Sequence, residues 1–233
     1  MRGSPCCKNP LEEHRNMEKK IGILFDLDGT LLNTLEDLAD AVNYALRRLG
    51  CPEHDLETVR TFVGNGAYNF MSKALPKWED APTADELFAM YNEYYQVHSR
   101  DKTRPYDGVL EAMAQISEKY PVAIVSNKHD TAVKPLCAEF FPGYYALGEV
   151  SGCPRKPAPD MVHKAMKELG VDTCIYVGDS EVDVLTAQNS GVPCLTVLWG
   201  FRDRQMLEES GAKHFCSEPG QLPECIDSLV GLL

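Results

Sequence analysis

The sequence predicts an α/β protein with a doubly wound parallel sheet and an inserted all-helical segment. Three observations lead to this fold class. Short apolar runs, typical of strands buried on both faces, alternate with amphipathic segments in the order that βαβ units require. This alternation stops between residues 33 and 105, where the pattern is helical throughout. Polar side chains follow several of the apolar runs, at the sheet edge where open α/β proteins bind their ligands.

The first expected strand is Ile21–Phe25, a continuous apolar run followed directly by acidic residues. Later apolar runs of the same kind cover residues 122–126, 174–178 and 193–198. The amphipathic segments between and around these runs cover residues 107–119, 131–140, 158–169 and 182–190. Strands and helices therefore alternate along the chain, and the expected core is a parallel sheet with helices on both faces.

The inserted segment begins with an amphipathic helix. Its apolar positions fall on one face at a period of 3.6 residues, and they are Leu35, Leu38, Val42, Ala45, Leu46 and Leu49. Thr34 is the expected N-cap, and Gly50 with Pro52 ends the helix. A second helix is expected over 83–99 and a hinge over 101–106. The expected division is a mobile tail at 1–17, a core of 18–32 plus 106–233, and a helical domain at 33–105.

Composition and charge exclude several classes of protein. The formal charge of −12 argues against a general nucleic-acid binder, because phosphate backbones are held by excess lysine and arginine. No apolar run approaches the ~20 residues that cross a bilayer, so a membrane protein is not expected. The nine cysteines are scattered without a C-x-x-C pair, which favours reduced thiols and a cytoplasmic location. Because the net charge is −12, an anionic substrate must meet a local cationic site.

The segment Asp26-Leu27-Asp28-Gly29-Thr30 follows the first expected strand directly. Two carboxylates ~4 Å apart repel by about 4 kcal/mol at an effective dielectric constant of 20, so the pair needs a cation, a shared proton or both. Such an arrangement suits a nucleophile beside a general acid. The alternative is a simple Asp-Gly turn after the strand.

Two further polar positions are candidates for phosphate binding. Ser126 and Asn127 come at the end of the second expected strand, where a hydroxyl and the backbone N–H groups after it can hold phosphoryl oxygens. A helix cap or a turn is the alternative. Lys156 lies in a loop that is fixed by Pro157 and Pro159. Such a loop presents the ammonium group at a defined position, although a solvated surface lysine is also compatible with the pattern.

Two aspartates flank the expected junction between a later strand and its helix. Asp179 and Asp183 are four residues apart in the segment GDSEVD, so both carboxylates can face the same point. A few carboxylate oxygens, with positions left open for water and phosphate, are what Mg²⁺ accepts. The alternative is an acidic first turn that stabilises the helix dipole.

In this order, FDLDGT, Ser126, Lys156 and GDSEVD resemble the four motifs of the haloacid dehalogenase superfamily of hydrolases. The resemblance covers essentially residues 19–233, and the helical insert resembles the helical cap of that superfamily. VGNG at 63–66, PYDG at 105–108 and WGF at 199–201 resemble the phosphoglycolate phosphatase branch. The resemblance implies a Mg²⁺-dependent phosphatase acting on a small phosphorylated metabolite, with 2-phosphoglycolate as the expected substrate.

The resemblance also implies a role for each motif. Asp26 would attack phosphorus to form an aspartyl phosphate, and Asp28 would protonate the leaving alkoxide and then activate water. Magnesium would be held by the Asp26 carboxylate, the Asp28 carbonyl and Asp179, with Asp183 in support. The residues expected to bind phosphate or substrate are Ser126, Asn127, Lys156, Gly64, Asn65 and Gly66. The last three belong to the insert and are equally compatible with a plain turn.

Other functions remain open at this point. A pyrophosphatase or a sugar-phosphate phosphatase would share the scaffold and differ only in the pocket of the insert. A phosphoacceptor regulatory module also pairs an aspartate with a lysine on a doubly wound sheet, but it leaves Asp28 and the insert unexplained. A catalytically silent binding protein would leave four intact motifs unexplained. Monomer and homodimer are both compatible with the sequence.

Overall fold

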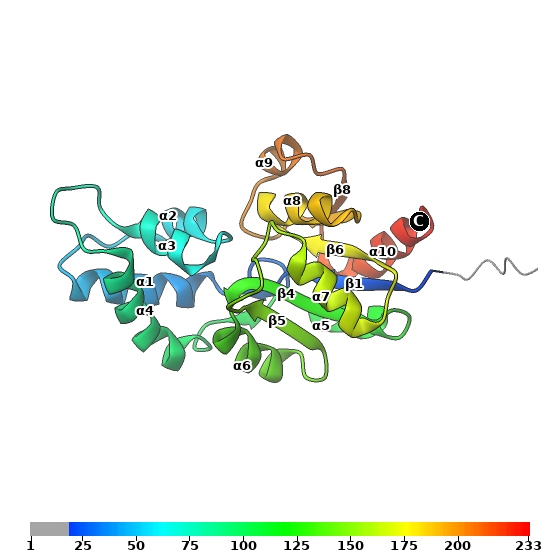
Figure 1. Cartoon of the computed structure of the whole chain (residues 1–233), viewed down its shortest axis with the longest axis horizontal. Helices are drawn as coiled ribbons and strands as arrows, with labels where there is room; N and C mark the ends of the chain where they lie inside the picture. Colours follow the sequence, from blue (N-terminus) through cyan, green and yellow to red (C-terminus); the bar gives the residue numbers. More distant parts are fainter. Residues whose placement is uncertain (1–18) are drawn as a thin grey trace, which may run out of the picture.

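A six-stranded sheet forms the centre of the computed structural model, which describes residues 19–233 (Figure 1). The expected tail at 1–17 lies outside the described residues. The strands are β1 Ile21–Phe25, β4 Val122–His129, β5 Tyr145–Glu149, β6 Thr173–Gly178, β7 Cys194–Val197 and β8 His214–Cys216. Their order is β5-β4-β1-β6-β7-β8, and every neighbouring pair is parallel. The predicted doubly wound parallel sheet is therefore confirmed.

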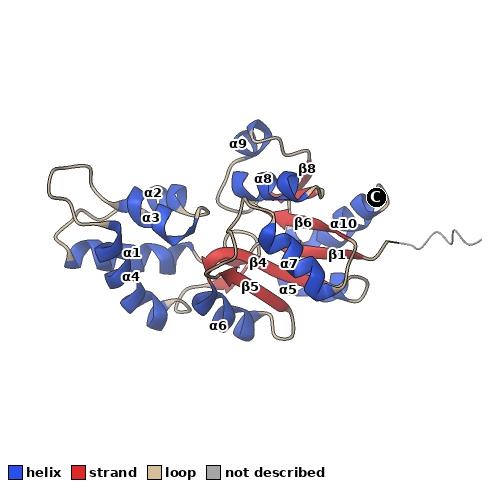
Figure 2. Cartoon of the chain, in the orientation of Figure 1, coloured by secondary structure: helices blue, strands red, loops and turns tan. Residues whose placement is uncertain are grey.

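Helices cover both faces of the sheet, as Figure 2 shows in blue against the red strands. One face packs on α5 Val109–Ser117, α6 Asp130–Phe140 and α10 Leu222–Val230, and the other on α7 Asp160–Leu169 and α8 Glu181–Ser190. Side chains of a strand alternate between the two faces. In β1, Ile23 and Phe25 join the first cluster and Leu24 the second. The strands are buried on both faces, which explains their continuous apolar runs.

The edge strands and several helices were not predicted. The apolar runs located β1, β4, β6 and β7, but β5 and β8 at the two edges of the sheet were missed. The helices α9 Arg204–Glu209 and α10 were also missed, whereas α2 Leu56–Phe62 and α3 Gly66–Ala74 lie within the segment that was expected to be helical throughout. In addition, β4 continues to His129, beyond the expected end at residue 126, and this extension adds Lys128 to the strand.

Four helices make up the inserted segment, α1 Leu35–Arg48, α2 Leu56–Phe62, α3 Gly66–Ala74 and α4 Ala84–His98. They lie together to the left of the sheet in Figure 1, and we refer to them as the helical unit. Their apolar faces form a separate cluster that contains Leu38, Met71 and Tyr91. Phe201, from the loop after β7, also packs into this cluster. The loop after β7 therefore connects the sheet to the helical unit.

Two short strands join the helical unit to the core. Leu32–Asn33 forms β2, Arg104–Pro105 forms β3, and the two pair antiparallel. The expectation that no strand occurs between residues 33 and 105 is therefore wrong at both ends of that segment. Two-residue strands are too short to show a period-2 pattern, which explains the error. Asp37 strengthens the junction, because its carboxylate accepts the backbone N–H groups of Lys102 and Thr103.

Two expectations from the sequence concern membrane-spanning segments and the state of the cysteines. The described residues contain no helix with the length and hydrophobicity that a membrane span needs. The cysteines among them, from Cys51 to Cys225, are all free thiols.

Candidate active site

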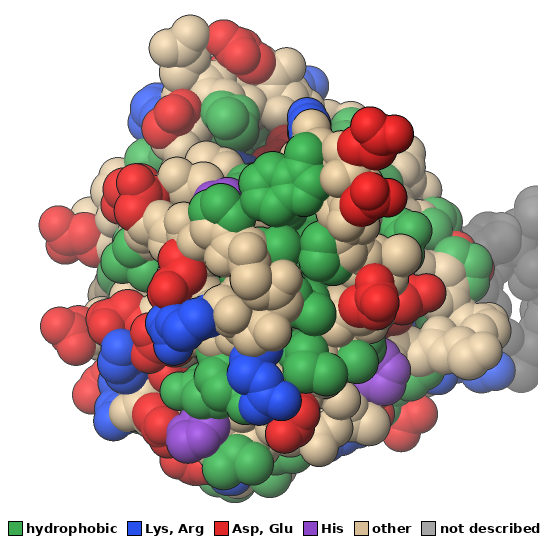
Figure 3. Space-filling view, turned by 90° about the vertical axis from the view of Figure 1, so that its left-hand side faces the viewer, with side chains coloured by type: hydrophobic (Ala, Val, Ile, Leu, Met, Phe, Trp, Pro, Cys, Tyr) green, Lys and Arg blue, Asp and Glu red, His purple; other side chains and the backbone are tan. Residues whose placement is uncertain are grey.

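A cavity of about 160 Å³ lies between the carboxyl ends of the central strands and the helical unit. The core contributes Asp26, Asp28, Ser126, Asn127, Lys128, Lys156 and Asp179 to its wall, and the helical unit contributes Val63, Gly64, Gly66, Phe70, Tyr91 and Tyr95. Acidic side chains are more prominent than basic ones on the face of the helical unit that Figure 3 shows. Attraction of an anionic substrate must therefore come from cations inside the cavity.

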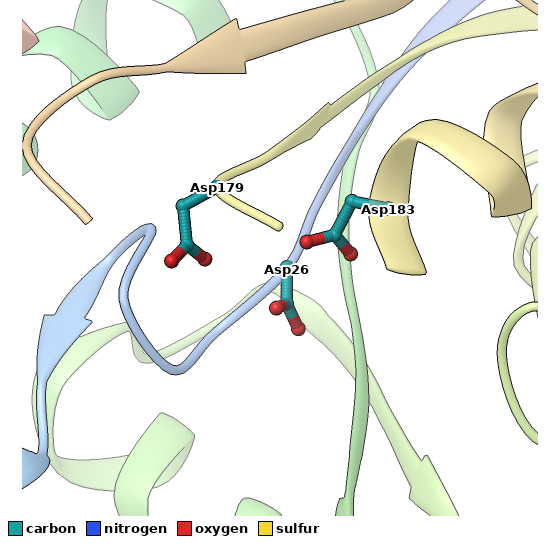
Figure 4. A group of neighbouring side chains, drawn as sticks. All are labelled: Asp26, Asp179 and Asp183. Carbon is teal, nitrogen blue, oxygen red and sulfur yellow. The ribbon is translucent and has the colours of Figure 1, made fainter. Parts of the chain in front are cut away.

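Three buried aspartates converge at the strand ends (Figure 4). Asp26 follows β1, Asp179 follows β6, and Asp183 lies in the first turn of α8. One oxygen from each lies within 4.8 Å of the others. Burial and the nearby Asp183 carboxylate raise the pKa of Asp26 well above its usual value and the pKa of Asp179 to about 7. The cluster therefore has excess negative charge that a cation would compensate.

Lys156 supplies one positive charge to this cluster. Its side chain is 2 % exposed, and its Nζ lies 2.8 Å from both Asp26 Oδ1 and Asp183 Oδ1. It also donates to the hydroxyl of Tyr176. Burial acts to lower the pKa of Lys156, but Asp183 and Asp26 outweigh it and raise that pKa well above its usual value. Lys156 is therefore a charged group of the cavity, and the solvated surface lysine is ruled out.

The donor set and the space around it fit a divalent cation. The carboxylates of Asp26, Asp179 and Asp183 outnumber the single ammonium group of Lys156. Carboxylate oxygens are the ligands that Mg²⁺ prefers. At Gly200 an added Cβ would overlap the Asp179 side chain. Space for this carboxylate therefore depends on the absence of a side chain at position 200.

Asp28 lies in a different environment from Asp26. Its Oδ1 accepts a hydrogen bond from Thr34 Oγ1 at 2.6 Å and lies 3.0 Å from Lys128 Nζ. Thr34 takes the expected N-cap position before α1, but its hydroxyl donates to Asp28 and makes no capping bond to the helix. The two aspartates of the first motif therefore have separate partners, although one residue separates them.

The residues expected to bind phosphate meet at the cavity. Ser126 is buried, and its Oγ accepts the backbone N–H of Lys128. Asn127 Nδ2 donates to the carbonyls of Gly64 and Lys156, while its Oδ1 is buried with no hydrogen-bond partner in the described part of the chain. Asn127 therefore connects the core loop at Lys156 to the helical unit.

The insert residues expected to bind substrate are placed differently from one another. Gly64 and Gly66 line the cavity, and both have positive φ values, of 119° and 76°. Asn65 precedes α3 and is not one of the residues that line the cavity. Their role in substrate binding remains a prediction.

Several cavity residues were missed by the sequence analysis. Lys128 was not singled out, and its contact with Asp28 joins segments far apart in the chain. Tyr91 and Tyr95 follow the apolar pattern of a helix and give no separate signal. Arg202 donates to Glu181 and to the carbonyls of Arg60 and Val63. None of these contacts can be read from local spacing, since the partners lie far apart in the chain.

The fold and the site define a class of hydrolase, with an aspartate nucleophile candidate at the end of a central parallel strand and a helical insertion that covers it. The family model for haloacid dehalogenase-like hydrolase matches residues 23–197. The chain therefore belongs to the haloacid dehalogenase-like hydrolases. The predicted superfamily is confirmed.

Curated relatives and solved structures indicate which members of the family the chain resembles. The chain is 34% identical over 218 residues to the phosphoglycolate phosphatase of Pseudomonas syringae pv. tomato, covering 88% of this chain and 79% of the relative. It is 30% identical over 217 residues to that of Neisseria meningitidis, covering 89% and 92%. A crystal structure from Lactobacillus delbrueckii subsp. bulgaricus, classed by prediction as a phosphoglycolate phosphatase, aligns with a TM-score of 0.82 at 36% identity, covering 89% of this chain and 98% of that one. The protein is a phosphoric monoester hydrolase similar to phosphoglycolate phosphatases.

Proposed function

We propose that this protein hydrolyses 2-phosphoglycolate in a Mg²⁺-dependent reaction through an aspartyl phosphate on Asp26. The main support is the separation of Asp26 and Asp28 into two environments at one cavity. Asp26 lies in the aspartate cluster beside Lys156, whereas Asp28 lies beside Thr34 and Lys128. A nucleophile must be ionised and a general acid must hold a proton; because burial and Asp183 raise the pKa of Asp26, its ionisation in this scheme would depend on Lys156 and on the bound cation.

The aspartate cluster is the proposed cation site. Asp26, Asp179 and the Asp28 carbonyl would hold Mg²⁺, which would neutralise charge on the transferring phosphoryl group. Asp183 has a supporting role, since its Oδ1 accepts from Lys156 and its Oδ2 accepts from Ser180. Asp183 therefore also fixes the position of the Lys156 ammonium group.

In the proposed reaction, the Asp26 carboxylate attacks phosphorus, and Lys156 and Ser126 hold the phosphoryl oxygens. Asp28 donates its proton to the leaving alkoxide and then accepts one from the water that hydrolyses the aspartyl phosphate. The hydrogen bond from Thr34 fixes the orientation of the Asp28 carboxyl group. Asp28 therefore acts from a position whose partners differ from those of Asp26.

We assign the helical unit, residues 33–105, the role of a cap on the core formed by residues 18–32 and 106–233. The apolar walls contributed by Phe70, Tyr91 and Tyr95 support water exclusion from the reacting groups. Gly64, Asn65 and Gly66 are retained as proposed substrate-binding positions at the cap. A reducing compartment such as the cytoplasm is also part of the proposal, and the free thiols support it.

The test compares wild type with Asp26→Asn on a panel of phosphate esters. Wild type is expected to hydrolyse 2-phosphoglycolate with Mg²⁺, to lose activity in EDTA and to regain it when Mg²⁺ is added back. Asp26→Asn keeps the shape of the side chain but is a far poorer nucleophile and a weaker cation ligand, so turnover should be abolished in a folded protein. The matched control is Asp160→Asn, an exposed position on α7, which should retain full activity.

Specific outcomes would contradict this assignment. Equal or greater turnover of pyrophosphate or a hexose phosphate would exclude 2-phosphoglycolate as the preferred substrate. Stable phosphorylation of Asp26 without steady turnover would favour a phosphoacceptor regulatory module. Undiminished hydrolysis by Asp26→Asn, with the amide verified by mass spectrometry, would exclude Asp26 as the nucleophile.

A further inference from the structure

The lysine and arginine side chains that line the cavity differ in how many ion pairs and hydrogen bonds they already make within the protein. Among the described residues the cavity-lining lysines and arginines are Arg100, Lys128, Lys156 and Arg202. Lys156 is held between two aspartates, and Arg202 bonds Glu181 and two backbone carbonyls. Arg100 is half exposed and pairs with Glu139. Lys128 is therefore the cation to consider for a second anionic group of the substrate.

Lys128 has one carboxylate partner and an aromatic neighbour. Its side chain is 8 % exposed, its Nζ lies 3.0 Å from Asp28 Oδ1, and the same atom lies 5.0 Å from the centre of the Tyr95 ring. An ammonium group has three N–H donors. Asp28 is its hydrogen-bonding partner within the described residues, so Lys128 retains donors for a further acceptor in the cavity.

Tyr95 presents an unsatisfied donor beside this lysine. It comes from α4 of the helical unit, is 3 % exposed and lines the cavity. Its hydroxyl is buried and has no hydrogen-bond partner in residues 19–233. A buried polar group without a partner destabilises the protein, and a ligand acceptor would offset this cost. Lys128 Nζ lies 5.0 Å from the centre of the ring that carries this hydroxyl, so two donors from neighbouring side chains are available to a ligand carboxylate.

The contact between Lys128 and Asp28 indicates where in the substrate a carboxylate bound by Lys128 would lie. In the proposed reaction Asp28 contacts the bridging oxygen of the ester. In a phosphate ester of a 2-hydroxy acid, a single carbon separates this oxygen from the carboxylate. The carboxylate therefore lies next to the group that contacts the bridging oxygen. Lys128 is the cation in direct contact with that group, and it can bridge Asp28 and the carboxylate.

We propose that Lys128 and Tyr95 form a carboxylate-binding subsite that makes the enzyme selective for phosphate esters of 2-hydroxy acids. This proposal rests on the proposed phosphatase function and adds the residues that determine its specificity. Without the lysine, a substrate carboxylate would meet the negative charge of the aspartate cluster with no cation beside it. The subsite joins one residue of the core to one residue of the helical unit, so selection requires both.

The test uses two esters that differ only in the group concerned. Ethyl phosphate has a methyl group where 2-phosphoglycolate has the carboxylate. Lys128→Met should lower kcat/KM for 2-phosphoglycolate about 10- to 100-fold more than for ethyl phosphate, the range expected when a hydrogen bond to a charged group is lost. Tyr95→Phe should lower the same ratio about 3- to 10-fold, as for a single uncharged donor. Tyr95→Phe removes one oxygen atom, so it keeps the test valid if Lys128→Met does not fold.

Matched controls are Lys164→Met, exposed on α7, and Tyr94→Phe, which neighbours Tyr95 but does not line the cavity. Neither should change the ratio of the two kcat/KM values. An equal loss on both esters in Lys128→Met would mean that Lys128 acts only through Asp28, and would overturn the subsite. A wild-type enzyme that hydrolyses both esters equally would also overturn the subsite while leaving the phosphatase function intact. Failure of wild type to hydrolyse either ester with Mg²⁺ would overturn both proposals.

Discussion

Arg60 and Arg202 each donate hydrogen bonds to backbone carbonyls of the segment that contains the other. Arg60, on α2 of the helical unit, donates to the carbonyls of Gly200 and Phe201 at 2.9 Å. Arg202, on the core loop, donates to the carbonyls of Arg60 at 3.2 Å and Val63 at 2.6 Å. The backbone N–H of Phe201 in turn donates to Asp179 Oδ2 at 2.7 Å. The reciprocal pair therefore links the helical unit to the aspartate cluster.

Loss of either arginine should weaken catalysis by loosening this link. We expect Arg60→Met to lower kcat for 2-phosphoglycolate about 10-fold, since about 1.4 kcal/mol of positioning free energy corresponds to a tenfold change in rate. Arg202→Met should have a similar effect. The double variant should lose less than the product of the two single losses, because both arginines hold the same pair of segments.

Steady-state kinetics and thermal unfolding of the three variants measure these effects. The control is Arg47→Met, which removes an exposed ion pair with Glu53 in the helical unit and should leave kcat unchanged. Fully independent losses in the double variant would show that the two arginines do not act as one link.

Gly200 should be required for cation binding. A Cβ at this position would overlap the Asp179 side chain, so Gly200→Ala must displace that carboxylate. We expect the Mg²⁺ concentration for half-maximal activity to rise at least about 10-fold, in line with the effect of removing residues that orient metal ligands. Gly220→Ala is the matched control, since a Cβ there meets nothing within 4 Å. An unchanged Mg²⁺ requirement in Gly200→Ala would place the cation away from Asp179.

The central half of the fold was predictable because its strands are buried on both faces. A strand such as β1 must be apolar at every position, so Ile21–Phe25 is visible as a run. The edge strand β5 has the sequence YALGE, and β8 has only three residues, so neither shows a continuous apolar run. The polar residues that follow β1 and β6 and those near the end of β4 could be placed together, since parallel strands end at one edge of the sheet.

The remaining part of the site depends on contacts between distant segments. Lys128 and Asp28 are 100 positions apart, and the pairing exists only because β4 lies beside β1 in the sheet. The arginine pair binds backbone carbonyls, which every residue possesses, so no residue type marks the partner. The Thr34 side chain was expected to accept a backbone N–H as a helix cap, but its hydroxyl donates to Asp28 instead. Each of these contacts is determined by tertiary packing and not by local sequence.

Two threonines that precede helices should respond in opposite ways to the same substitution. Thr83 makes a capping box with Glu86 at the start of α4, whereas Thr34 donates to Asp28. We expect Thr83→Val to lower the free energy of unfolding by about 1 kcal/mol with kcat unchanged. Thr34→Val should lower kcat about 10-fold through loss of a bond to a charged group. Thr34→Ser keeps the hydroxyl and should restore most of kcat; no rescue by serine would assign the loss to packing.

Asp28→Asn should damage the chemical step more than substrate binding. Under the proposed mechanism Asp28 must begin protonated to assist the leaving alkoxide, and an amide cannot transfer a proton. The loss should therefore appear mainly in kcat, on the order of 10²–10⁴-fold, the usual contribution of general acid–base catalysis. It should be smaller for formation of the phosphoenzyme from an aryl phosphate, because a phenolate leaves with little protonation.

Rapid-quench measurement of phosphoenzyme formation, with one alkyl and one aryl phosphate, separates this first step from hydrolysis of the aspartyl phosphate. The second step still needs a base, so steady-state turnover of the aryl phosphate should remain impaired in Asp28→Asn. Asp37→Asn is unsuitable as a control because Asp37 holds the junction near β3, whereas Asp160→Asn changes the same functional group on the surface. If Asp28→Asn slowed phosphoenzyme formation equally with the alkyl and with the aryl phosphate, Asp28 would not be the general acid. The contact between Asp28 and Lys128 would then serve binding alone.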